Sequence, residues 1–302
     1  MEGAASLASG PDGKKRRYFY EPYIGEGNQR VSQQISTTHN LIRSYQLHND
    51  MEIIRPRLAK DSDFIQFHSS RNYPRALQLR RVGHPGPFFP GLVDYCRRYA
   101  GGSLSAASKL TRRETDIAIN WSGGMHRAKR DEACGFGYVN DVVLGILELL
   151  NVFKRVLYID IGYYHGDAVQ EAFDETDRVM TISFHKHGAQ RSGYITDYGF
   201  DDASFITLFV PVIHKAMEVY QPEAIVLQCG PDSLAGDGRF NLTTKGHAAC
   251  LQYIRSFNVR LMLLGGQGHT LVNVVRCWCY ETAVAVGKEI DDDIDINVSY
   301  AC

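Results

Sequence analysis

The segment Asp160–Asp167 carries carboxylate and imidazole side chains directly after an apolar run. Side chains of these types hold metal ions and transfer protons. The apolar run, RVLYIDI at 155–161, is typical of a buried parallel strand. In an open α/β sheet the carboxyl ends of the strands face the ligand crevice. We therefore expect Asp160–Asp167 to form the floor of any site in this protein.

Three other predicted strands are followed by polar side chains of the same kinds. These side chains are His126, Asp232 and His269. A single Asp after a strand more often caps a helix than binds a ligand. Four strand ends with such residues at one edge of one sheet shift the balance toward a functional site.

Strands and helices alternate along the chain. The predicted strands are 18–23, 52–56, 116–121, 155–161, 178–184, 224–229 and 260–264. The predicted helices are 38–45, 92–109, 142–150, 205–220, 243–257 and 272–286. We expect an interruption at Gly101-Gly102, a kink at Pro211, and a helix cap within Asp61–Asp63. The alternation predicts an α/β fold, an open, doubly wound, mainly parallel sheet with helices on both faces.

Composition excludes several classes of protein. The net charge of the 302 residues is −1, so no overall field attracts nucleic acid or an anionic membrane. No apolar run approaches the roughly 20 residues of a transmembrane helix. The N-terminus lacks the apolar core of a secretory signal. Seven cysteines without a CxxC pair suit a reducing compartment. We expect neither direct DNA binding nor membrane contact.

The two ends differ from the middle of the chain. Residues 1–17 are predicted to be a disordered basic tail, 18–290 a single domain, and 291–302 an acidic exit that frays. The run Lys14-Lys15-Arg16-Arg17 has the composition of a nuclear-import signal. A solvated tail is the favoured interpretation of that run.

Several long blocks resemble class I histone deacetylases, most closely their plant branch. The blocks include WSGGMHRAKRDEACGFGYVND, RVLYIDIGYYHGDA, VLQCGPDSLAGD and GGQGHTLVNVVRCWCYE, and the resemblance runs from about residue 18 to 287. It implies the arginase/deacetylase α/β fold and zinc-dependent removal of acetyl groups from lysine. It also implies histone tails and corepressor subunits as partners, and a nuclear location, with the cytoplasm kept as an alternative.

The resemblance implies metal-assisted amide hydrolysis. Zinc held by two carboxylates and one imidazole polarises the acetyl carbonyl and lowers the pKa of its bound water to about 7. Two consecutive histidines, each oriented by an Asp, handle the protons. A tyrosine hydroxyl stabilises the oxyanion, and such a donor is typically worth roughly 3 kcal/mol.

Part of this machinery is matched in the sequence. His126 matches the first histidine of the pair, and Asp160 matches the carboxylate that orients it. Asp167 matches the Asp behind the second histidine. Asp232 matches one of the metal-binding Asp residues. The tunnel for acetyl-lysine is matched by a glycine and an aromatic residue, Gly135 and Phe136.

The departures fall on the chemistry. Arg127 replaces the second histidine, and His269 replaces the oxyanion tyrosine. The other two metal-ligand positions carry Gly162 and Tyr164. The rim Asp that grips the substrate falls at Pro85. Compared with the family, the loops at 25–34 and 188–198 are shortened, the latter with loss of a strand, and the C-terminal segment after Gly287 is absent.

One of three inherited zinc ligands therefore remains. Asp232 alone should not hold zinc, since a catalytic site needs three protein ligands. Guanidinium stays protonated and cannot act as a base. We expect Arg127 to pair instead with Asp167, a carboxylate expected to be buried. A replacement cluster of Asp232, His165 and His269 is disfavoured because His165 directly follows the lost ligand position.

Three hypotheses follow. The favoured one is a histone deacetylase relative with a degraded zinc centre, weak or lost activity, and a binding or scaffolding role toward corepressor subunits. The second is a functional histone deacetylase. The third is an unstable product of a decaying gene, since a sheet edge left unpaired by a deletion is prone to aggregate.

Overall fold

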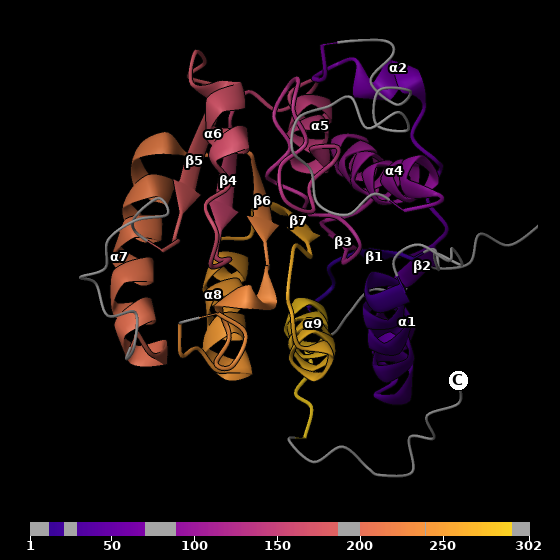
Figure 1. Cartoon of the computed structure of the whole chain (residues 1–302). Coiled ribbons are helices and arrows are strands. Elements are labelled where there is room, and N and C mark those ends of the chain that lie inside the picture. Colours follow the sequence, from indigo (N-terminus) through magenta and orange to yellow (C-terminus); the bar gives the residue numbers. More distant parts are fainter. Residues whose placement is uncertain (1–11, 21–28, 70–88, 187–199, 239, 292–302) are drawn as a thin grey trace, which may run out of the picture.

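The computed structural model describes residues 12–20, 29–69, 89–186, 200–238 and 240–291. Their seven strands form one parallel sheet in the order β2-β1-β3-β7-β6-β4-β5 (Figure 1). The strands are β1 (Arg16–Phe19), β2 (Glu52–Ile54), β3 (Ile117–Asn120), β4 (Val156–Asp160), β5 (Val179–Ser183), β6 (Ala224–Gln228) and β7 (Arg260–Leu264). The predicted α/β fold, with its doubly wound parallel sheet, is confirmed.

Helices cover both faces of the sheet (Figure 1). One face is covered by α4 (Leu92–Thr111), α5 (Asp141–Leu149) and α6 (Asp167–Phe173). The other is covered by α1 (Gln29–Ser44), α7 (Asp202–Tyr220), α8 (Thr244–Ser256) and α9 (Leu271–Val286). Short helices are η1 (Leu47–Asp50), α2 (Asp61–Phe64) and η2 (Pro231–Ser233). None of the helices described is long and apolar enough to cross a membrane.

Burial on both faces explains the unbroken apolar strands. In β4, Leu157 and Ile159 pack into the core beneath α1, α7, α8 and α9. Val156 and Tyr158 pack into the core beneath α4, α5 and α6. Successive side chains of a strand point to opposite faces, so a strand covered on both sides needs apolar residues at almost every position.

Strand β1 begins two residues before the expected start of the domain. Arg16 and Arg17, expected in a solvated tail, are buried within it. Arg16 Nε donates to the Ala285 carbonyl at 2.5 Å. Arg17 forms ion pairs with Glu52 and Glu114, each at 2.7 Å. These two cations are therefore part of the sheet, which corrects the expected boundary of the tail.

Three local expectations also change. Asp61–Asp63 is itself part of α2, whose N-cap is Lys60. Helix α4 continues through Gly101 and Gly102. A Cβ at Gly101 would lie 1.9 Å from the Arg57 carbonyl oxygen, so this glycine permits close packing rather than a break. Helix α1 begins well before the predicted 38–45. Helix α7 contains Pro211, as predicted, and the kink expected there stays a prediction.

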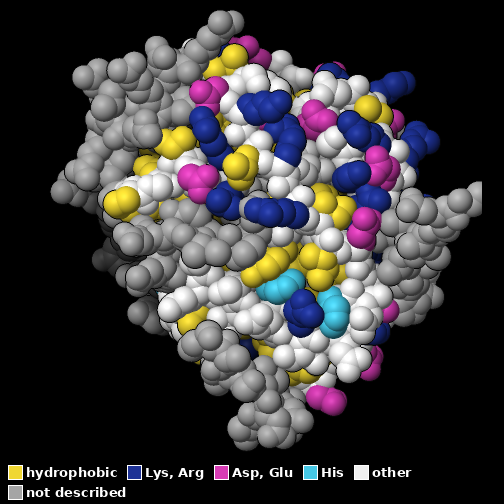
Figure 2. All heavy atoms as spheres, turned by 90° about the vertical axis from the view of Figure 1, so that its right-hand side faces the viewer, with side chains coloured by type: hydrophobic (Ala, Val, Ile, Leu, Met, Phe, Trp, Pro, Cys, Tyr) yellow, Lys and Arg dark blue, Asp and Glu magenta, His cyan; other side chains and the backbone are white. Residues whose placement is uncertain are grey.

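Basic and acidic side chains alternate on the face that carries α4 and α1 (Figure 2). Arg97 pairs with Asp61 at 2.5 Å and Arg98 with Asp94 at 2.8 Å. These arginines are thus partly neutralised by neighbouring carboxylates.

Four features discussed from the sequence lie outside the described residues. They are Pro85, the shortened loop at 188–198, most of the acidic exit, and the first residues of the loop at 25–34.

Candidate functional site

The central strands end side by side. The registers pair Asn120 with Leu264, Leu264 with Gln228, and Gln228 with Asp160. The loops that follow β3, β4, β6 and β7 therefore leave the sheet at one edge. They carry the residues that the sequence predicted to meet there.

His126 and Asp160 form a buried pair. His126 Nδ1 lies 2.7 Å from Asp160 Oδ2, and both side chains are almost fully buried. The Tyr158 hydroxyl donates to the same oxygen at 2.8 Å, and the Gly162 N–H donates to Oδ1 at 3.0 Å. Burial lowers the pKa of His126, but the Asp160 carboxylate outweighs burial and raises it overall. The expected orienting role of Asp160 fits this geometry.

Asp232 lies in η2, directly after β6. Its Oδ1 accepts the Tyr163 N–H at 2.9 Å. Burial raises the pKa of Asp232 to about 7, although the Tyr163 N–H and His126 act in the opposite direction. The carboxyl group is thus partly protonated at neutral pH.

Gly162, which the resemblance aligns with a second ligand position, has no side-chain donor atom. A Cβ built on Gly162 would lie 3.2 Å from Asp232 Oδ1 and 3.2 Å from Asp160 Oδ1, so this position faces the remaining carboxylates. Tyr164, at the third position, is 38% exposed, and Arg127 Cζ lies 5.6 Å from the centre of its ring. One buried carboxyl, a glycine and a phenol beneath a guanidinium do not fit a catalytic zinc ion.

Arg127 and Asp167, predicted to pair, form no ion pair with each other in the described part of the chain. Asp167 is the first residue of α6, and its side chain is 49% exposed. Its Oδ2 lies 3.9 Å from Lys129 Nζ, and its Oδ1 accepts the Ala168 N–H. The expectation was wrong because Asp167 is solvated and needs no buried counter-charge. Arg127 instead lies against Tyr164, with its Nε buried and without a hydrogen-bond partner among described residues.

The disfavoured replacement cluster does not assemble. His165 stacks on His185 with ring centroids 3.9 Å apart, and its Nε2 lies 3.1 Å from Gln170 Oε1. His269 is exposed on the loop after β7, where its N–H donates to the Asp237 carboxylate at 3.0 Å. Neither histidine has a described hydrogen bond or ion pair with Asp232.

The first of the two predicted tunnel residues, Gly135, lies beside Arg127. Gly135 has φ +58°, and a Cβ there would lie 3.4 Å from Arg127 Nη1. Phe136 is 46% exposed and borders a cavity of about 70 Å³, which His269 also lines. The tunnel role of Gly135 and Phe136 stays a prediction.

Sequence reasoning missed one cluster. His247, Cys277 and Glu281 are buried between α8 and α9, with their donor atoms within 4.8 Å of one another, the only such group of three among the residues described. His247 Nδ1 lies 2.7 Å from Glu281 Oε1, so imidazole and carboxylate already pair directly. The two residues are 34 positions apart, and no local pattern joins them. This group is best described as a buried polar pair with a neighbouring thiol.

Comparison with known proteins places the chain. The protein-family model of the histone deacetylase domain matches residues 28–285. Histone deacetylase 7 of Arabidopsis thaliana is 56% identical over 96% of this chain and 82% of its own length. Histone deacetylase 6 of the same plant is 54% identical over 98% and 72%. Probable histone deacetylase 1-A of Xenopus laevis is 46% identical over 94% and 67%. The resemblance inferred from the sequence is confirmed, and the chain belongs to the histone deacetylase family.

Proposed function

We propose that this chain is a histone deacetylase relative that has lost zinc-dependent hydrolysis and acts by binding. The observation that carries the proposal is the position of Gly162. Its missing side chain would point at Asp232 Oδ1, where the family places a second carboxylate. With no donor there, the partly protonated Asp232 faces no second ligand.

The proton chemistry is also incomplete. His126 and Asp160 keep the geometry of an oriented imidazole. The second proton-handling position is Arg127, whose guanidinium stays charged and cannot accept a proton from water. His269 offers an exposed imidazole in place of the phenol that stabilises the oxyanion. Neither water activation nor oxyanion stabilisation has its full set of groups.

The scaffold that would carry a binding role is well packed. Both faces of the sheet are covered by apolar side chains of seven helices among the described residues. This packing supports a folded scaffold over an unstable product. Acetylated histone tails and corepressor subunits are the proposed partners, and the nucleus is the proposed location, all by analogy with the family.

Zinc content and activity of the purified full chain test the proposal. We expect less than about a tenth of a zinc ion per chain, and no hydrolysis of an acetyl-lysine peptide above that of Asp232→Ala. The matched variant restores the family residues at four positions: Arg127→His, Gly162→Asp, Tyr164→His and His269→Tyr. We expect this variant to gain zinc. One zinc per unmodified chain, with activity abolished by Asp232→Ala, would overturn the proposal in favour of a functional deacetylase.

A further inference from the structure

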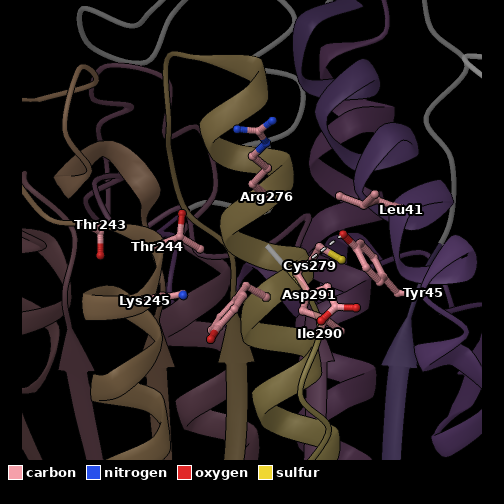
Figure 3. A pocket seen from close by; sticks show the side chains of 10 residues that line it. Leu41, Tyr45, Thr243, Thr244, Lys245, Arg276, Cys279, Ile290 and Asp291 are labelled. Carbon is pink, nitrogen blue, oxygen red and sulfur yellow. Dashed lines mark hydrogen bonds between the residues drawn. The ribbon is translucent and has the colours of Figure 1, made fainter. Parts of the chain in front are cut away.

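A second cavity lies between the C-terminal end of α1, the start of α8, and α9 (Figure 3). Its volume is about 360 Å³, within the usual range of small-molecule sites. It shares no lining residue with the His126–Asp160–Asp232 group or with the cavity beside Phe136. From its lining we propose that it binds a small organic anion that has an apolar body and a carboxylate or phosphate head.

One side of the cavity offers positive charge and hydrogen-bond donors. Figure 3 shows Lys245 and Thr244 at the start of α8, and Arg276 on α9. Among the described residues, neither the Thr244 hydroxyl nor the Arg276 guanidinium has a hydrogen-bond or ion-pair partner within the protein. A guanidinium and a hydroxyl that border one cavity without acceptors suit a carboxylate or phosphate, which guanidinium can bind through two hydrogen bonds.

The other side is mainly apolar, with one carboxylate, that of Asp291. Leu41 lies in α1 and Tyr45 directly follows that helix, and Cys279 and Ile290 complete the apolar part of this wall. Burial raises the pKa of Cys279 to about 12, so its thiol stays uncharged at neutral pH. An aromatic or aliphatic body can pack here while the head group reaches Arg276. The thiol adds no nucleophile, so binding is non-covalent.

The wall is fixed before a ligand arrives. After α9, Gly287 adopts φ +78° and ends the helix. Lys288 Nζ then pairs with Asp50 Oδ2 at 2.5 Å. The Tyr45 hydroxyl donates to the Asp291 carbonyl at 3.4 Å. Because these contacts hold the segment against η1 and the turn that follows α1, little ordering remains to oppose binding.

A pair of fluorescent probes that differ in charge tests the inference on the full chain. The anionic probe is 8-anilino-1-naphthalenesulfonate, and the neutral probe is N-phenyl-1-naphthylamine. We expect saturable binding of the anion at one site per chain, and at least tenfold weaker binding of the neutral probe. Benzoate and phenyl phosphate should displace the anion, and their order decides between a carboxylate and a phosphate head. Inorganic phosphate, which lacks the apolar body, should displace it much less.

Variants locate the site. Arg276→Gln should lower the affinity for the anionic probe about tenfold, which is the typical effect of losing one charge-assisted hydrogen bond. The matched control is Arg112→Gln, an exposed arginine at the end of α4 and outside the cavity. Thermal melting of each variant checks that it is folded. Equal affinity of Arg276→Gln and the unmodified chain, or equal binding of the two probes, would overturn the inference. Zinc content does not enter this test, so its outcome is independent of the proposed loss of hydrolysis.

Discussion

Replacing Asp232 by asparagine should stabilise the protein at alkaline pH. The pKa of Asp232 is raised from its usual 3.8 to about 7, chiefly by burial. An acid whose pKa is raised by folding supports the folded state at low pH, and that support is lost as pH rises from the unfolded toward the folded pKa. Asparagine keeps an oxygen to accept the Tyr163 N–H, and it carries no charge to bury.

The magnitude follows from the shift. Each pKa unit corresponds to about 1.36 kcal/mol, so ionised Asp232 costs about 4 kcal/mol of unfolding free energy at pH 8. At pH 5 the folded protein keeps the proton, and the cost falls to about 2 kcal/mol. The advantage of Asp232→Asn over the unmodified chain should therefore grow by about 2 to 3 kcal/mol between pH 5 and pH 8.

Urea unfolding at both pH values, with a chelator present, measures this difference. The control is Asp174→Asn, an exposed carboxylate at the C-cap of α6, which should show no such growth. A variant that is less stable than the unmodified chain at pH 8 would refute the reasoning. Because the chelator removes divalent cations, that result would mean that contacts within the protein hold Asp232 in its ionised form. A repeat without chelator, with and without added zinc, tests separately whether a cation stabilises that form.

Three further predictions concern packing and charge. His247→Ala should cost about 3 to 5 kcal/mol of unfolding free energy, because it leaves the Glu281 carboxylate buried without its partner. Chemical denaturation measures this, with the exposed His214→Ala as control. Gly101→Ala should lower stability by at least about 1 to 3 kcal/mol, since its Cβ would overlap the Arg57 carbonyl. An effect no larger than that of Ser105→Ala in the same helix would contradict this. Asp160→Asn should lower the pKa of His126, because the carboxylate is what raises it. An NMR titration of the ring that shows no fall would count against the pairing.

The strands of the sheet were predictable because burial on two faces requires a continuous run of apolar residues, which is visible in the local sequence. Strand β4 reads as an apolar run since both of its faces meet a core. The start of β1 was not predictable in this way. Arg17 is buried only because Glu52 and Glu114, both distant in sequence, neutralise it. Local composition at that point indicates a tail.

In the candidate site, too, the features that follow from the strand order were predictable, and those that depend on contacts distant in sequence were not. The meeting of His126, Asp160 and Asp232 followed from the rule that parallel strands share one carboxyl edge. The environment of Asp167 did not, since its exposure depends on where α6 begins. The His247–Glu281 pair depends on the packing of α8 against α9, which no motif records. The sequence predicted a helix break at Gly101 because glycine has a low helix propensity. In the structure this glycine lets the helix pack closely against the carbonyl of Arg57, a contact that propensity does not register.

The burial of Arg16 and Arg17 bears on how the N-terminal basic run can be recognised. Strand β1 lies between β2 and β3, and it pairs with both. A receptor that binds Lys14 to Arg17 as one extended segment would have to break the pairing of β1 with both neighbouring strands. Four adjacent cations are thus presented together while the chain is still unfolded. Once the sheet closes, the side chains of the last two are withdrawn from solvent.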